Sequence, residues 1–178
     1  EQNENIIVLE LNVSTENIQN IQEMEKVFHK NADRGFADHG WLKTHHSFSF
    51  ASYHDPEKMN FGLLRVLNDD IVAPSRGFDM HRHQDMEIIT IPLAGSLQHR
   101  DNMGNEGVIR SGEVQVMSAG SGVMHSEFNA SDTEDVSLFQ IWIFTDKKEH
   151  DPRYDQKKFS KEGRKEKWQL LVSPDGQN

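Results

Sequence analysis

The chain of 178 residues has the length of one domain. Apolar residues make up 35% of it and charged residues 27%, and no apolar run approaches the roughly 20 residues of a membrane-spanning helix. The amino end, EQNENIIVLELN, lacks the basic start and apolar stretch of a secretion signal. These features predict a cytoplasmic globular protein without a membrane segment.

The chain has ten histidines and no cysteine. Disulfide scaffolds, thiolate metal sites and cysteine nucleophiles are therefore excluded. A transition-metal site in this chain would have to use imidazole and carboxylate ligands.

Acidic residues outnumber basic ones by 29 to 19, which gives a formal charge of −10. Residues 147–167 hold nine basic and five acidic residues, a net of +4 that leaves −14 for the rest of the chain. A body of that charge argues against direct nucleic-acid binding, which depends on attraction to phosphates. We interpret the basic stretch as a solvated loop.

Residues 1–26 differ from the rest of the chain and carry six acids and one lysine. The segment STENIQNIQEMEKVFHK begins with a Ser/Thr cap and places Ile18, Ile21, Met24 and Phe28 at helical spacing. We expect an acidic amino-terminal extension that contains one short amphipathic helix.

From about residue 61 the pattern changes to short apolar segments bounded by turn residues. These segments are GLLRVLND, EIITIPLAG, EVQVMSAG, SLFQIWIFT and KWQLLVSP. They are rich in Ile, Val, Leu and Phe, and no segment of helical periodicity interrupts residues 61–145. The pattern predicts an all-β sandwich or barrel.

Two pairs of polar residues have the spacing of metal ligands on strands. His81 and His83 are two residues apart in an extended segment, so both imidazoles point to one face, and Glu87 shares their parity. His125 and Glu127 repeat this spacing on another expected strand. One such pair is more often two partly exposed histidines. Two such pairs on the inner face of a barrel would supply three imidazoles and one carboxylate, which suit Fe(II), Mn, Ni, Cu or Zn.

The surrounding residues resemble known motifs. The pattern Gly77-x3-His81-x-His83-x3-Glu87 is similar to the first cupin motif, and Gly112-x5-Ser118-x-Gly120-x4-His125 to the second, with Ser118 where cupins usually have proline. The blocks HGWLKTHHSFSFASYHDP, LRVLNDDIVAP, HRHQDMEIITIPLAGSLQHRDNMGN and MSAGSGVMHSEFN resemble the pirin family, most closely its bacterial quercetin 2,3-dioxygenases. The resemblance covers roughly residues 27–175 and implies a cupin-type jelly-roll β-barrel.

The same resemblance implies one divalent transition metal, most simply Fe(II), with Zn, Cu, Ni, Mn and Co as alternatives. It assigns the ligands His81, His83, His125 and Glu127, and it places Glu87 beside the ligands rather than among them. Pirins usually have two barrels with the metal in the first. We therefore expect an extension at 1–26, the metal-binding barrel at 27–146, and a basic loop and closing strand at 147–178 that lead to a truncated second barrel.

The implied activity is cleavage of flavonols such as quercetin with O₂, with Glu127 as the base that takes the proton of the substrate's 3-hydroxyl. Another class remains open, because some pirins resemble iron-dependent, redox-sensitive cofactors that act on transcription factors through protein contacts. A cupin that keeps its metal only for structure is the third interpretation. Aerobic turnover of quercetin separates the first from the other two.

Two further expectations concern residues outside the ligand set. His99 stands near a turn in SLQHRDNMGN, where a surface position is favoured over ligation. Residues 168–172 are expected to form a strand whose neighbours belong to the second barrel. An unpaired strand edge invites pairing with another chain, so we expect self-association through this end or through the amino-terminal helix.

Overall fold

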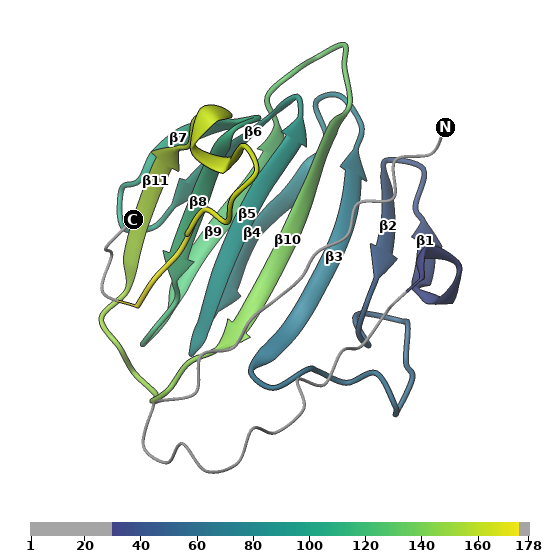
Figure 1. Cartoon of the computed structure of the whole chain (residues 1–178), viewed down its shortest axis with the longest axis horizontal. Coiled ribbons are helices and arrows are strands. Elements are labelled where there is room, and N and C mark those ends of the chain that lie inside the picture. Colours follow the sequence, from purple (N-terminus) through teal and green to yellow (C-terminus); the bar gives the residue numbers. More distant parts are fainter. Residues whose placement is uncertain (1–29, 175–178) are drawn as a thin grey trace.

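The computed structural model describes residues 30–174, which form two antiparallel β-sheets packed face to face (Figure 1). The larger sheet has the order β1 (Gly35–Asp38), β2 (Leu42–His46), β3 (Leu64–Val72), β10 (Val136–Phe144), β5 (Met86–Ala94), β8 (Glu113–Ser118) and β11 (Arg153–Lys158). The smaller sheet has the order β4 (Gly77–His83), β9 (Val123–Asn129), β6 (Ser96–Asp101) and β7 (Glu106–Arg110). The expectation of an all-β, cupin-type jelly roll is confirmed.

Four of the five predicted apolar strands are present as β3, β5, β8 and β10. In β3 and β10 the buried positions alternate with partly exposed ones, as expected for strands with one face on a core. The only helical elements between residues 30 and 174 are two 3₁₀ turns, η1 (Asn31–Asp33) and η2 (Glu162–Arg164). No helix in this part of the chain is long and apolar enough to cross a membrane.

The core between the sheets has two apolar clusters on either side of a polar centre. One cluster contains Leu42, Val72, Leu97, Val136 and Leu138, with Trp41 and Phe78 packed against it. The other contains Ile88, Met117 and Val123, with Met86 and Trp142 packed against it. Burial of each large apolar side chain stabilises the fold by roughly 1.5–3 kcal/mol, so the two clusters can hold polar groups between them.

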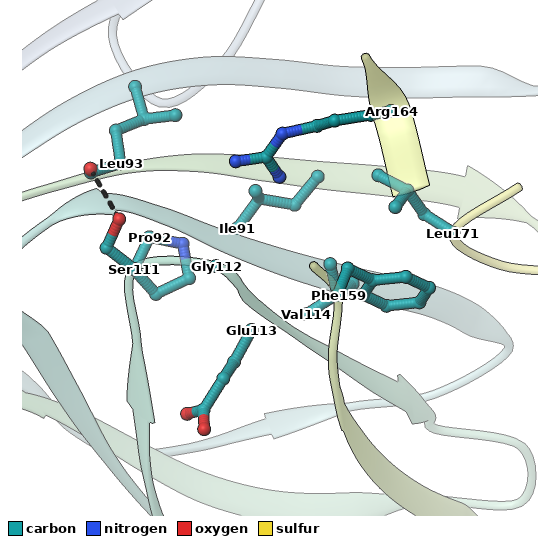
Figure 2. Close-up of a pocket in the computed structure, with 10 residues that line it drawn as sticks. All are labelled: Ile91, Pro92, Leu93, Ser111, Gly112, Glu113, Val114, Phe159, Arg164 and Leu171. Carbon is teal, nitrogen blue, oxygen red and sulfur yellow. Dashed lines mark hydrogen bonds between the residues drawn. The ribbon is translucent and has the colours of Figure 1, made fainter. Parts of the chain in front are cut away.

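Part of the outer face of the larger sheet, around β5 and β8, is covered by residues 159–172, which we name the C-terminal arm (yellow in Figure 1). Phe159 is buried with Ile89 and Val114, and Leu171 packs against the same cluster. Figure 2 shows Phe159, Leu171 and Arg164 of the arm around a cavity of about 190 Å³ whose floor is formed by β5 and β8. The arm therefore completes an apolar layer outside the sheet.

The strand expected at residues 168–172 is not formed, so that prediction is wrong. Leu171 and the adjacent Val172 both pack against the sheet, whereas the exposed fractions of Trp168 and Leu170 are 79% and 58%. This is not the strict alternation of a strand. The strand position beside β8 is already filled by β11, so residues 168–172 have no free edge there to pair with.

The basic stretch 147–167 was interpreted as a solvated loop, and this too needs correction because it contains β11. Tyr154 and Gln156 point inward while their neighbours on the strand are more exposed, so the strand has period 2 with little apolar character. Gln156 Nε2 donates to the Val108 carbonyl at 3.1 Å and to Glu113 Oε2 at 3.0 Å. Polar contacts of this kind leave no hydrophobic signal in a sequence.

The helix expected before residue 29 lies outside the described residues. The boundaries at 26 and 146 and the truncated second barrel stay predictions. Self-association also stays a prediction, which sedimentation at micromolar concentration would test, but it no longer has a strand edge at residues 168–172 to support it.

Candidate metal centre

Three adjacent strands of the smaller sheet each place two polar side chains, two residues apart, on the inner face of the fold. β4 contributes His81 and His83, β9 contributes His125 and Glu127, and β6 contributes His99 and Asp101. In the β-ladders His125 lies opposite both His81 and Asp101, and Glu127 lies opposite His99. The six side chains form one polar patch with β9 at its middle.

Three imidazoles of this patch converge. The ring centroids of His81 and His125 are 4.4 Å apart, those of His81 and His83 are 4.8 Å apart, and those of His83 and His125 are 4.9 Å apart. One ring nitrogen of each lies within 4.8 Å of the other two. His81 and His83 are half-buried and His125 is fully buried, so the group is open on the β4 side.

A bulge in β4 determines how His81 enters the group. Phe78 pairs with Glu127 and His81 pairs with His125, so β4 has one more residue than β9 over this step. The extra residue lets Phe78 and His81 both face inward, and it brings the Asp79 carbonyl to 2.7 Å from His81 Nδ1. Since a carbonyl only accepts, His81 Nδ1 donates and its Nε2 is left as a lone-pair ligand.

Gly77 permits the close approach of β4 to β9 at this point. A Cβ at this position would collide with the Glu127 carbonyl and with the backbone of Phe128. The glycine that opens the first sequence motif therefore has a steric role next to the cluster.

Burial keeps two imidazoles of this group, those of His83 and His125, neutral. Removal from solvent, with a smaller contribution from His81, lowers the pKa of His83 to about 4. Removal from solvent, together with His81 and His83, lowers the pKa of His125 to about 2. Neutral imidazole is the form that binds metal ions.

The donor set fits a divalent transition metal. His125 Nε2 is buried and has no hydrogen-bond partner among the described residues, which is a costly arrangement for a polar atom unless a ligand binds it. Two neighbouring imidazole nitrogens accompany it, and neutral nitrogen donors of this kind suit Fe(II), Ni, Cu, Mn or Zn.

Glu127 joins the two sheets and lies deeper than the three imidazoles. Its Oε1 accepts from Thr90 Oγ1 at 3.2 Å and its Oε2 accepts from Gln140 Nε2 at 3.0 Å, and both donors belong to the larger sheet. Burial raises the pKa of Glu127 to about 7, although these hydrogen bonds oppose the rise. Within 4.8 Å the carboxylate is grouped with His99 and His125 and not with His81 and His83.

Glu87 does not continue the β4 pair. The chain turns between His83 and Met86, so Glu87 lies on β5 in the larger sheet. Its Oε2 accepts from Ser118 Oγ at 2.6 Å, and the alternation of β5 places it on the same side as Ile89 of the outer cluster. Sequence parity suggested that Glu87 could join the ligands, and the resemblance to pirins placed it beside them. Both expectations are wrong, because β4 ends before residue 87 and Glu87 lies on the outer side of the larger sheet.

His99 is the residue that the sequence interpretation missed. It was expected at the surface near a turn, but its side chain is completely buried next to His125. The turn follows Asp101, so His99 is still within β6 and faces inward. The i, i+2 spacing of His99 and Asp101 is the signal that could have identified it.

Comparison with known proteins places this chain in a family. The model of the family described as Pirin matches residues 27–143. The chain belongs to the pirin family.

Curated pirin relatives match most of this chain. "Quercetin 2,3-dioxygenase" of Escherichia coli (strain K12) is 48% identical over 146 residues, which cover 82% of this chain and 62% of the relative. "Pirin-like protein" of Caulobacter vibrioides is 52% identical over 139 residues, which cover 78% of this chain and 60% of the relative. The chain thus spans about 60% of the length of the curated relatives it matches.

A solved structure agrees in fold. The crystal structure of the bacterial pirin YhhW from Escherichia coli in complex with nickel(II) is 49% identical to this chain and superposes with a TM-score of 0.72. The match covers 74% of this chain and 57% of that structure. Nickel(II) is thus present in a pirin of closely similar sequence.

Aromatic side chains flank the open side of the pirin cluster described here. The indole ring of Trp142, on β10, lies 4.8 Å from the His83 ring in an edge-on arrangement, and Phe50 packs against Trp142 at 5.3 Å. None of the four residues around a separate cavity of about 170 Å³, Gln98, Arg100, Ser126 and Phe128, belongs to the imidazole group. Trp142 is a large aromatic neighbour of His83.

Proposed function

We propose that this chain is the metal-binding barrel of a pirin dioxygenase that acts on flavonols such as quercetin. The observation that carries the proposal is the convergence of three imidazoles, one of which has a buried Nε2 without a hydrogen-bond partner in residues 30–174. The names of the curated relatives supply the substrate class. Because the chain spans about 60% of those relatives, its own turnover is part of what must be tested.

His81, His83 and His125 would hold the metal through neutral nitrogens, with Fe(II) as the first candidate, and Glu127 is proposed as the fourth ligand. A bound divalent metal supplies a Lewis acid for the substrate hydroxyl and a centre for O₂ chemistry. Glu127 reaches the group by a rotation of its side chain away from Thr90 or Gln140, which are neutral donors. In this proposal the three imidazoles would remain fixed and the carboxylate would move to a second position at the metal.

In this proposal the Glu127 carboxylate accepts the proton of the flavonol 3-hydroxyl, because a carboxylate that is only partly committed to a metal retains a free oxygen. Trp142 lies beside His83 and offers an apolar surface for a flat aromatic ring.

Aerobic turnover of quercetin by the Fe(II)-loaded chain tests the proposal, and the loss of the visible absorbance of quercetin is the readout. The metal-free protein and His83→Ala are the controls, and neither should turn over. Elemental analysis of protein purified without affinity metal identifies the native ion.

A protein that binds one equivalent of metal without turnover would contradict the enzymatic proposal. That result would leave the two alternatives: an iron-binding pirin that acts as a redox-sensitive cofactor of transcription factors through protein contacts, and a cupin that keeps its metal only for structure.

A further inference from the structure

The third polar pair of the patch, His99 and Asp101 on β6, lies behind His125 as seen from the imidazole group. His99 is fully buried, and its Nδ1 is 3.4 Å from His125 Nδ1 while its Nε2 is 3.3 Å from Asp101 Oδ2. The three side chains therefore form a line that ends at His125 Nε2, the buried nitrogen that has no partner within the described part of the chain.

Asp101 is held in place by several donors. Its Oδ1 accepts from the backbone N–H groups of Met103 and Asn105, both at 2.9 Å, and its Oδ2 accepts from Asn105 Nδ2 at 2.8 Å. Burial opposes the charge on Asp101, but these hydrogen bonds and the one from His99 together lower its pKa. An ionised carboxylate only accepts hydrogen bonds, so the direction of the line is determined at this end.

The remaining directions follow from the chemistry of neutral imidazole, which has one N–H and one lone pair. His99 Nε2 must donate to Asp101, so His99 Nδ1 accepts. The facing nitrogen, His125 Nδ1, must then donate, which leaves the lone pair of His125 on Nε2. His99 and His125 are both buried, so water does not compete for these contacts.

We infer that Asp101 and His99 are positioning residues that hold His125 in the tautomer whose Nε2 can bind the metal. The inference rests on the metal site proposed above. The bulge carbonyl of Asp79 does the same for His81, so two ligands on neighbouring strands are oriented by different means. Partners behind a ligating histidine set its tautomer and its ring orientation in metal sites generally.

The stacked ring of Tyr154 holds the orientation of the His99 ring. The two rings are stacked with centroids 4.7 Å apart and an interplanar angle of 24°. Tyr154 belongs to β11, the strand that lies beside β8 at the edge of the larger sheet. The line formed by Asp101, His99 and His125 is thus supported by residues of both sheets, and it needs no polar contact with solvent.

The decisive experiment reads the tautomer of His125 in the metal-free 178-residue chain by long-range ¹H–¹⁵N NMR. We expect the Nδ1–H form in the unmodified chain. In Asp101→Asn, the amide oxygen must still accept from Met103 and Asn105, so the amide nitrogen faces His99 Nε2. That contact forces His99 to donate from Nδ1 and switches His125 to the Nε2–H form.

Titration with Ni(II) alone, followed by calorimetry, gives a second readout. Asp101→Asn and His99→Leu should bind Ni(II) about 10–100-fold more weakly, as is typical when the partner of a ligand is lost. His99→Gln should bind nearly as the unmodified chain does, because its amide can accept from His125 and donate to Asp101. His54→Leu, at an exposed histidine away from the patch, is the matched control.

The Nε2–H form of His125 in the unmodified chain, or an unchanged tautomer in Asp101→Asn, would overturn the inference. If Asp101→Asn does not fold, equal Ni(II) affinities for His99→Leu and His99→Gln would overturn it as well. A chain that shows the expected tautomers but binds no Ni(II) would instead contradict the proposed metal site, so the two failures are distinguishable.

Discussion

The two strands that flank β9 have the same polar spacing but different surroundings. On β4, at the edge of the smaller sheet, His81 and His83 are half-buried and open toward solvent. On β6, which lies between β9 and β7, His99 and Asp101 are buried. The open pair suits ligands that a substrate must reach, and the closed pair suits residues that orient a ligand from behind.

The largest expected effect is on the β4 side. His83→Ala should remove most of the metal, because a missing imidazole leaves an incomplete donor set. The loss of Ni(II) affinity should exceed the roughly 10–100-fold expected for changes on the β6 side. Metal content per chain after desalting and the calorimetric affinity are the measurements.

His54→Ala is the control for that substitution, since it also removes an imidazole but at an exposed position outside the patch. Full metal occupancy in His83→Ala would exclude His83 as a ligand. It would also reverse the comparison between β4 and β6. His99 on β6 would then be the better candidate for a metal ligand, in the second possible metal-binding group of His99, His125 and Glu127.

On the central strand, Glu127→Gln should keep substantial metal but lower quercetin turnover by about 10²–10⁴-fold, the usual contribution of a positioned base. Glutamine preserves the shape and one coordinating oxygen, but it does not accept the substrate proton at neutral pH. Turnover and metal content must be measured on the same preparation.

Glu87→Gln is the matched carboxylate control, because Glu87 lies on β5 and is hydrogen-bonded to Ser118. It should leave turnover nearly unchanged. Equal turnover in Glu127→Gln and the unmodified chain would eliminate Glu127 as the base and direct attention to water as the proton acceptor.

The fold and part of the site could be predicted from the sequence because their signals are local. The apolar runs that became β3, β5, β8 and β10 have strand composition, and the pairs at His81 and His125 have the spacing of one strand face. Gly77 and the similarity to pirin motifs identified these pairs as parts of known metal-binding motifs. These features depend on neighbours two to ten residues away.

The rest of the site depends on contacts between distant segments. His99 is buried because β6 lies between two strands of the smaller sheet and because Tyr154 stacks on it from β11, 55 positions later. The polar strand β11 has no apolar alternation to mark it, and Glu87 appeared to share a strand with His83 because the turn at Asp85 has no proline or glycine. Burial of polar residues is decided by tertiary pairing, which periodicity does not encode.

A second buried carboxylate sharpens the contrast with Asp101. Asp70, on β3, is buried, and its Oδ1 has no hydrogen-bond partner among the described residues. Burial raises the pKa of Asp70 to about 6, against a hydrogen bond from Thr44 that lowers it. Where Asp101 is surrounded by donors that keep it charged, Asp70 is held in a place that disfavours its charge.

The smallest expected effect follows from this difference. A raised pKa means that the folded chain binds the Asp70 proton more tightly than the unfolded chain does. The associated stability is present below pH 4 and is lost as the pH rises to about 6, with an upper limit of about 3 kcal/mol for a shift of roughly two pKa units.

Asp70→Asn carries no such charge, so its free energy of unfolding should fall less between pH 4 and pH 7 than that of the unmodified chain. Urea unfolding of the metal-free proteins at both pH values measures this slope, with the exposed Asp132→Asn as control. A loss of stability in Asp70→Asn that is the same at both pH values would reflect an unpaired amide. The prediction is contradicted only if Asp70→Asn and the unmodified chain lose the same free energy of unfolding between pH 4 and pH 7, which would show that Asp70 keeps its charge without cost, as Asp101 does.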